Sequence, residues 1–211
     1  MADKKFLILI IILVILLGIG VIEFASKKSE RPSENNMPLT FESNNLSIEE
    51  YSKIKEEFLG LMNTRDPKFA LTELRERVKT DNALLRSCHA LVHEIGRAAY
   101  EKYKDFGETM KYKDEVCNSG YLHGVIEKHF SKSTDVFTAM KTVCNSYPLG
   151  KYLSWECFHG VGHGLRYSTS SELPRSLASC DKYESSFARL SCANGVFMEN
   201  FNTDQKFHHS K

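Results

Sequence analysis

The sequence of 211 residues predicts an all-α fold, either a helical-hairpin repeat array or a closed α-helical bundle, stapled by disulfides behind an N-terminal transmembrane anchor. Three observations predict it: apolar residues recur at helical spacing, a cysteine-led segment recurs four times, and a long apolar run comes first. Strands are not expected, because long alternating runs are missing and the Asn194-Gly195 pair lies inside a repeat.

Charge and composition exclude several classes of protein. The 28 basic residues nearly balance the 27 acidic ones, and a net charge of +1 is not typical of a general nucleic-acid-binding surface, so no nucleic-acid partner is expected. A chain that is 42% hydrophobic and 26% charged is neither disordered nor a polytopic membrane protein. The length suits a single folded domain with additional segments, since domains usually have ~100–200 residues.

The beginning of the chain predicts a membrane anchor. After a short tail at residues 1–5, residues 6–25 are apolar or small apart from Glu23. A helix of ~20 residues crosses the hydrocarbon core, whereas the apolar region of a cleavable signal peptide has only ~7–15 residues. We therefore expect an uncleaved anchor, with cleavage as the alternative, and the membrane as one partner.

The orientation of the anchor follows from the cysteines. Basic residues lie on both sides of the apolar run, so the positive-inside rule does not decide the orientation. All six cysteines come after the anchor, and an even number suits an oxidising compartment. We expect a single-pass protein of the cell membrane whose C-terminal domain lies outside the cytoplasm, joined to the anchor by a flexible polar linker at residues 26–46.

The remaining residues predict one α-helical domain at 47–203, followed by a polar tail at 204–211. Ser47 and Glu50 form a capping box, and Asp66 precedes Pro67 as an N-cap precedes proline at many helix starts. With the periodicity of the apolar residues, these signals predict helices over residues 47–62, 67–78 and 81–103.

Four segments that begin with a cysteine can be superimposed on one another. They begin at Cys88, Cys117, Cys157 and Cys192. The last three have glycine three residues after the cysteine and His, His or Met six residues after it; the first fits less well. The cysteines lie 29 to 40 residues apart, a spacing typical of helical-hairpin repeats, and partner helices are expected over residues 135–144 and 173–180.

The six cysteines predict three disulfides. Two pairs have similar separations and each spans a predicted helix–turn–helix, which leaves the first two cysteines for each other. The expected pairs are Cys144–Cys157, Cys180–Cys192 and Cys88–Cys117. Each bond is worth roughly 3 kcal/mol by loop-closure entropy. Zinc-type Cys-x-x-Cys pairs are absent, and a cysteine nucleophile is the other alternative.

Five histidines in the repeats are candidate metal ligands. They are His89, His93, His123, His159 and His163. Two pairs are spaced four residues apart, which places both rings of a pair on one face of a helix. Such a set suits Zn, Fe, Cu or Ni. In the repeat register Met198 is the fourth equivalent of the three histidines that end the segments, so these side chains are expected on one surface.

Charged residues near these histidines are candidates for supporting roles. Glu94 is the candidate general base, and Glu127 and Glu199 lie close enough in sequence to be ligands or hydrogen-bond acceptors. Arg97 and Arg166 are candidate binders of an anionic substrate group, with an ion pair to Glu94 or Glu127 as the alternative.

Glycines accompany the histidines, for example in the segment from His159 to Gly164. Each costs about 1 kcal/mol relative to alanine inside a helix, so their number indicates either a close approach of two backbones or a broken helix. Tight packing between helices is the simpler of these explanations.

Two hypotheses about function follow. The first is a metal-binding site, with a metalloenzyme left open. The second is a helical-repeat module that binds protein partners, with structural histidines and no catalysis. Ring nitrogens from three repeats within ~5 Å of a common point would favour the metal, because Zn–N bonds are ~2.0–2.1 Å. Rings spread along a ridge and bonded to carbonyls would favour the module.

Overall fold

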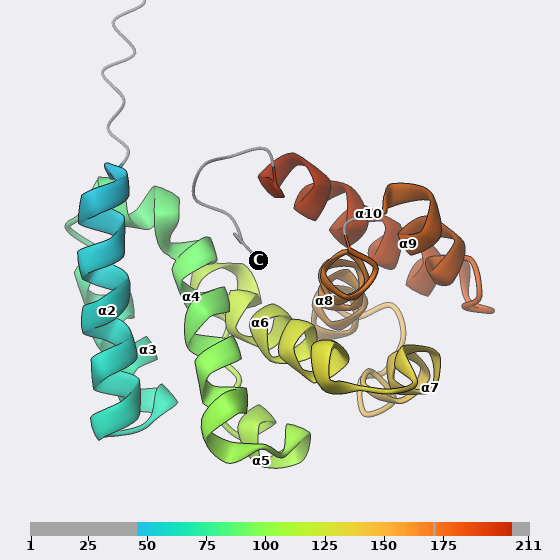
Figure 1. Ribbon diagram of the computed structural model, residues 1–211, viewed down its shortest axis with the longest axis horizontal. Helices are drawn as coiled ribbons and strands as arrows, with labels where there is room; N and C mark the ends of the chain where they lie inside the picture. The colour runs from blue at the N-terminus through green and yellow to red at the C-terminus, as the bar shows by residue number, and fades with distance from the viewer. Residues whose placement is uncertain (1–45, 171, 204–211) are drawn as a thin grey trace, which may run out of the picture. The chain divides into compact units, whose positions relative to one another are not determined.

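The computed structural model describes residues 46–170 and 172–203, and these residues contain helices and no strand, as predicted (Figure 1). The helices are α2 Ile48–Thr64, α3 Pro67–Arg77, α4 Asn82–Tyr103, α5 Phe106–Met110, α6 Val116–Lys132, α7 Val136–Thr142, α8 Tyr152–Ser168, α9 Leu173–Cys180 and α10 Ser186–Thr203. The predicted anchor and the polar tail lie outside the described residues. Within the described part, no helix is long and apolar enough to span a bilayer.

The first helices begin at the signals that the sequence contains. The Ser47 hydroxyl accepts from the Glu50 amide at 3.2 Å, and the Glu50 carboxylate accepts from the Ser47 amide at 2.8 Å, which is a complete capping box. The Asp66 carboxylate accepts from the Phe69 amide at 2.8 Å, with Pro67 as the first residue of α3. The predicted starts of α2 and α3 are confirmed.

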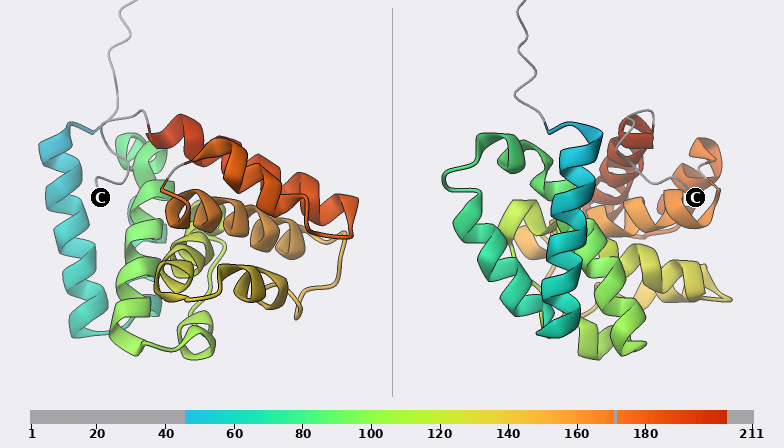
Figure 2. Two further views of the ribbon diagram at one scale, coloured as in Figure 1. Left: turned by 45° about the vertical axis from the view of Figure 1, so that its right-hand side comes forward. Right: turned by 60° about the vertical axis from the view of Figure 1, so that its left-hand side comes forward.

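The cysteine-led helices are neighbours in chain order. Helix α6 packs against both α4 and α8, and α10 packs against α8, as the views in Figures 1 and 2 show. Helices α2 and α3 cover α4, where Phe58, Leu71 and Leu91 are buried in a common core. The four cysteine-led helices therefore bring the predicted histidine positions onto adjoining elements.

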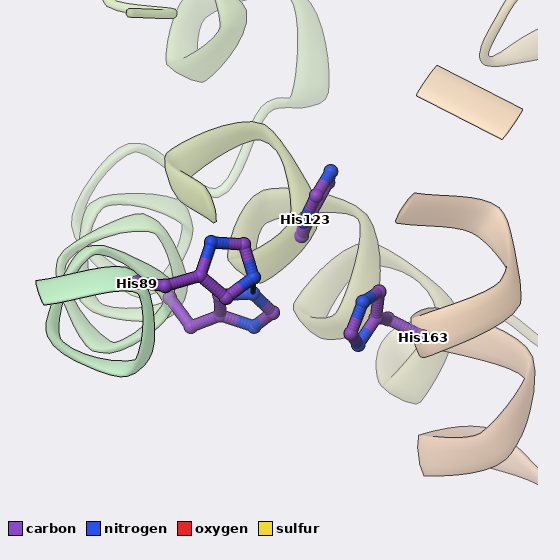
Figure 3. Close-up of side chains that lie close together, drawn as sticks. His89, His123 and His163 are labelled. Carbon is purple, nitrogen blue, oxygen red and sulfur yellow. Dashed lines mark hydrogen bonds between the residues drawn. The ribbon is translucent and has the colours of Figure 1, made fainter. Parts of the chain in front are cut away.

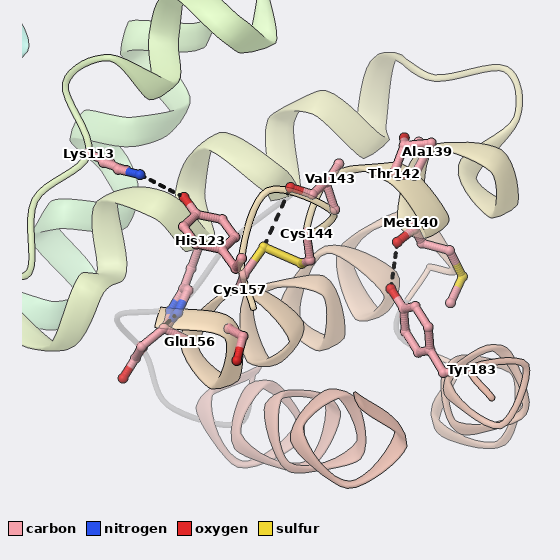
Figure 4. The surroundings of a disulfide bond; sticks show 12 residues. Lys113, His123, Ala139, Met140, Thr142, Val143, Cys144, Glu156, Cys157 and Tyr183 are labelled. Atoms are coloured by element: carbon pink, nitrogen blue, oxygen red, sulfur yellow. Dashed lines mark hydrogen bonds and ion pairs between the residues drawn. A yellow bond between two sulfur atoms is a disulfide. The ribbon is translucent and has the colours of Figure 1, made fainter. Parts of the chain in front are cut away.

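Three cysteine pairs lie at disulfide distance, and they are the three pairs that the sequence predicts. Their Cα–Cα distances are 5.7 Å for Cys88–Cys117, 5.8 Å for Cys144–Cys157 and 5.6 Å for Cys180–Cys192. The first pair joins α4 directly to α6. The other two tie the segment after α7 to α8 and tie α9 to α10; Figure 4 shows the bond beside α8.

Two glycines show how closely the inner helices approach. A Cβ atom on Gly124 of α6 would lie 2.1 Å from the His93 carbonyl oxygen of α4, and one on Gly195 of α10 would lie 1.9 Å from the His159 carbonyl oxygen of α8. No side chain fits at such distances. The glycines therefore serve a close approach of two backbones, and α8 runs unbroken through its glycine-rich segment.

A left-handed turn interrupts the start of α6. Cys117, Asn118 and Ser119 have φ values of 53°, 56° and 55°, although none is glycine. Left-handed backbone costs roughly 1–2 kcal/mol per L-residue, so the surroundings must hold this turn in place. Cys117 is tied to Cys88 by the disulfide, and its carbonyl accepts a hydrogen bond from His89.

Candidate metal centre

The candidate ligands come from four helices and are almost all buried. Helix α4 provides His89 and His93, α6 provides His123 and Glu127, α8 provides Glu156, His159 and His163, and α10 provides Glu199. Apart from the partly buried His89, each of these residues is at most 3% exposed. So many buried polar side chains require partners, because burying an unpaired polar group costs several kcal/mol.

The imidazole rings converge. One ring nitrogen from each of His89, His93, His123 and His163 lies within 4.8 Å of the others, so nitrogens from three helices meet. Figure 3 shows three of these rings, on three helices, around a common space. The rings are not spread along a ridge. Several histidines thus lie close enough together to hold a metal ion.

In the pair on α4, one nitrogen of each ring is committed to an acceptor on α6. His89 Nδ1 donates to the Cys117 carbonyl at 2.7 Å, and His93 Nδ1 donates to Glu127 Oε1, also at 2.7 Å. A carbonyl or a carboxylate can only accept, so Nδ1 carries the proton in both rings. The two Nε2 atoms face one another at 3.0 Å.

The pair on α8 repeats this arrangement for one of its two rings, that of His163. His163 Nδ1 donates to Glu199 Oε2 of α10 at 2.8 Å. Its Nε2 atom faces the Nε2 atom of His159 at 3.1 Å. Each pair of histidines therefore has a carboxylate on the next cysteine-led helix, and each presents two Nε2 atoms to one another.

His123 lies against both pairs, which themselves meet at His93 and His163 with ring centroids 5.1 Å apart, and it is held differently. Its ring centroid is 5.4 and 5.3 Å from those of His89 and His93, and 5.1 Å from both His159 and His163. Neither ring nitrogen makes a well-formed hydrogen bond within the described part of the chain, although Nε2 lies 3.2 Å from Glu156 Oε2. Both nitrogens of this buried ring are thus available to a ligand.

Burial keeps four of the rings neutral. It lowers the pKa of His89 and of His159, and lowers the pKa of His93 and of His123 well below the ordinary value of histidine. The neighbouring imidazoles act in the same direction, because a second positive ring nearby would repel the first. Neutral imidazole is the form that binds metal ions.

Glu127 pairs with two buried residues of the site, His93 and Arg97. It is fully buried; one oxygen accepts from His93 and the other contacts Arg97 Nη1. Arg97 also lies 2.9 Å from Glu94. The buried positive charge of Arg97 offsets the negative charge of Glu127, so the Glu127 carboxylate can remain an acceptor for His93.

The structure places the predicted charged residues as follows. Glu94, predicted as general base, does not join the histidine cluster: its carboxylate contacts Arg97 and its side chain is 25% exposed. Arg97 forms the ion pairs that were the alternative to substrate binding, and Arg166 is buried and donates to Asn200 Oδ1 at 2.8 Å.

One predicted position is wrong. Met198 is 37% exposed and does not share the surface of the histidines. Its neighbour Glu199 is buried instead and accepts from His163. Adjacent helical residues point about 100° apart, so Glu199, and not Met198, faces His163 from α10.

The sequence interpretation also missed two groups. Glu156, beside His123, could have been found because it precedes His159 by three residues and so shares its helix face. The Cys117 carbonyl could not have been found, since it reaches His89 only through the left-handed turn.

Comparison with protein-family models, with curated proteins and with solved structures finds no match. The role of the site is therefore inferred from its own residues. Their chemistry consists of neutral imidazoles that point at one another and carboxylates that accept from the far side of the rings.

Proposed function

We propose that this chain is a membrane-anchored, extracytoplasmic helical protein whose histidine cluster binds a transition-metal ion. The observation that carries the proposal is the facing of Nε2 atoms at 3.0 Å in the His89–His93 pair and at 3.1 Å in the His159–His163 pair. In three of these rings Nδ1 donates to a protein acceptor, so Nε2 holds a lone pair.

In the His89–His93 pair both Nδ1 atoms donate to acceptors, so two Nε2 lone pairs face one another at 3.0 Å and repel unless a cation lies between them. The cation is either a proton, which makes one ring an imidazolium, or a metal ion. An imidazolium at this site would be a buried charge surrounded by further imidazoles, which is costly. A metal ion satisfies both nitrogens at once, and it would also have one nitrogen of His123 as a ligand.

The distances suit a shared ion. Two nitrogens bound to one ion at ~2.0–2.1 Å lie about 2.9 Å apart at a right angle and about 3.3 Å apart at the tetrahedral angle. The observed separations of 3.0 and 3.1 Å fall between these values.

The outer hydrogen bonds support the same proposal. Histidines that bind metal ions usually donate their other N–H group to a carboxylate or a carbonyl, which fixes the ring and raises its basicity. His93 with Glu127, His163 with Glu199, and His89 with the Cys117 carbonyl have this arrangement. Imidazole ligands suit Zn, Fe, Cu or Ni.

The location rests on the sequence and on the cysteines. Residues 6–25 are long and apolar enough to cross a bilayer. Three cysteine pairs at disulfide distance suit an oxidising compartment. Protease protection in spheroplasts or intact vesicles tests this part: the domain is expected to be digested from outside, and digestion only after lysis would contradict it.

Metal analysis of the purified full chain tests the main proposal. After removal of metal with a chelator and reloading with Zn²⁺, the parent is expected to retain zinc through gel filtration, and His163→Ala to retain much less. His129→Ala is the matched control, because His129 bonds to Tyr100 away from the cluster. His208→Ala with His209→Ala removes the tail histidines that could bind zinc adventitiously. No zinc above background in the parent would overturn the proposal in favour of a protein-interaction module with structural histidines.

A metalloenzyme is the second candidate, and one observation favours it. A cavity of 320 Å³ reaches α6 at Ser119 and Leu122, beside His123 in the sequence. If small molecules enter there, azide should change the visible spectrum of the Co²⁺-loaded protein in a saturable way. Leu122→Trp, which fills the cavity, should weaken this binding without loss of cobalt. A spectrum that azide leaves unchanged would exclude an accessible metal.

A further inference from the structure

We infer that the cluster is a two-metal centre, with one ion bound by His89 and His93, a second bound by His159 and His163, and His123 between the ions. The inference rests on the proposed function and extends it. The first support is duplication: cysteine, two histidines four residues apart and an arginine follow in the same order on α4 and on α8.

Each half has supports of its own on the next cysteine-led helix. The α4 pair has two acceptors on α6, the Cys117 carbonyl and the Glu127 carboxylate. The α8 pair has the Glu199 carboxylate on α10. The Nδ1 hydrogen bonds of each pair go to that pair's own acceptors, although His163 Nδ1 also lies 4.0 Å from Glu127 Oε1.

A single ion does not use all the groups that converge. Zinc in proteins takes four ligands, and one ring nitrogen each from His89, His93, His123 and His163 would fill that set. His163 Nε2, once bound to that ion, would have no lone pair left to accept a hydrogen bond from His159 Nε2, which lies 3.1 Å away. An imidazole nitrogen has one lone pair, so His163 Nε2 serves one ion only. The facing of His159 and His163 is explained if that ion is their own.

His123 is suited to the position between two ions. Its ring lies at nearly equal distance from both pairs, and neither of its nitrogens makes a well-formed hydrogen bond in the described part of the chain, although Nε2 lies 3.2 Å from Glu156 Oε2. An imidazole that binds through both nitrogens releases its remaining proton to solvent and becomes a bridging imidazolate. Paired ions are a common device in metal sites that stabilise charge on two oxygens of one substrate group.

The experiment is the zinc content of the full chain, with His208→Ala and His209→Ala in every sample. Two ions per chain are expected in the parent, and one each in His89→Ala/His93→Ala and in His159→Ala/His163→Ala. The sharpest variant is His159→Asn, because His159 lies outside the group of four mutually close histidines. It is expected to lose one of two ions, whereas a one-ion site predicts no change; His129→Asn is the control.

The outcomes separate the two proposals. No bound zinc in the parent overturns the proposed function. One ion per chain, unchanged in His159→Asn, overturns only the two-metal inference. A measurement on the parent alone guards against variants that fail to fold: two Cu²⁺ ions per chain should give an exchange- or dipole-coupled electron paramagnetic resonance spectrum, and the spectrum of isolated Cu²⁺ at full loading would contradict the inference.

Discussion

Two pairs of helices, α4 with α6 and α8 with α10, present histidines in the same geometry but hold them in different ways. In both pairs, two histidines lie four residues apart and a carboxylate comes from the next helix. A disulfide joins α4 directly to α6, whereas the disulfides of α8 and α10 lead to the segment after α7 and to α9. Arg97 contacts two carboxylates, and Arg166 donates to the amide of Asn200.

The same ring positions are therefore held by different means in the two pairs of helices. A left-handed turn and a covalent bond fix the acceptor of His89, while helical side chains fix the acceptor of His163. The histidine site on α4 and α6 should therefore be affected by loss of its buried charge and of its disulfide. The site on α8 and α10 should be affected less.

Loss of the buried carboxylate should have the largest effect. Glu127→Ala leaves Arg97 buried with one carboxylate fewer, and should lower the free energy of unfolding of the metal-free protein by about 3–5 kcal/mol. Glu199→Ala removes an acceptor of His163 and should cost about 1–3 kcal/mol. Urea unfolding followed by circular dichroism measures both. Equal losses would show that the two pairs are supported alike.

Removal of a disulfide separates stability from metal binding. Cys88→Ser/Cys117→Ser and Cys180→Ser/Cys192→Ser should each lower the free energy of unfolding by about 3 kcal/mol. Only the first should weaken zinc binding, by about 10–100-fold, because it frees the carbonyl that orients His89. Competition with a zinc-binding dye measures the affinity. An equal loss of affinity in both variants would mean that the effect is general loosening of the fold.

The glycine contacts should give the smallest difference between the pairs. Gly124→Ala and Gly195→Ala place a Cβ about equally close to a carbonyl oxygen, so each should cost about 1–3 kcal/mol. Gly60→Ala is the control, because nothing lies within 4 Å of its Cβ position, and it should stabilise α2 by about 1 kcal/mol. Thermal unfolding of the three variants checks this; tolerance at either inner position would mean that the helices do not approach so closely.

Much of the fold was predictable because its signals are local. The capping residues Ser47 and Asp66 specify helix starts through bonds within four residues, and the repeat of cysteines at similar spacing predicted the disulfide pairs. The five histidines were found because a spacing of four residues fixes a common helix face.

The supports of the rings were less predictable because they depend on tertiary contacts. Glu94 adjoins His93 in the sequence, but adjacent helical residues do not face each other, and the acid that bonds to His93 is Glu127 on another helix. The turn at Cys117 uses no glycine, so no residue type marks it. Met198 was misplaced because adjacent helical residues point to different faces, and in α10 it is Glu199 that faces His163.

X-ray absorption spectroscopy at the zinc edge of the reloaded protein tests the central claim most directly. We expect the spectrum to show a first coordination shell of nitrogen at ~2.0–2.1 Å from the zinc and the multiple-scattering pattern of several imidazoles. His163→Ala should reduce the imidazole contribution, and His129→Ala should leave it unchanged. A shell made of oxygen alone, or one with sulfur at ~2.3 Å, would contradict a metal centre built from the buried histidines.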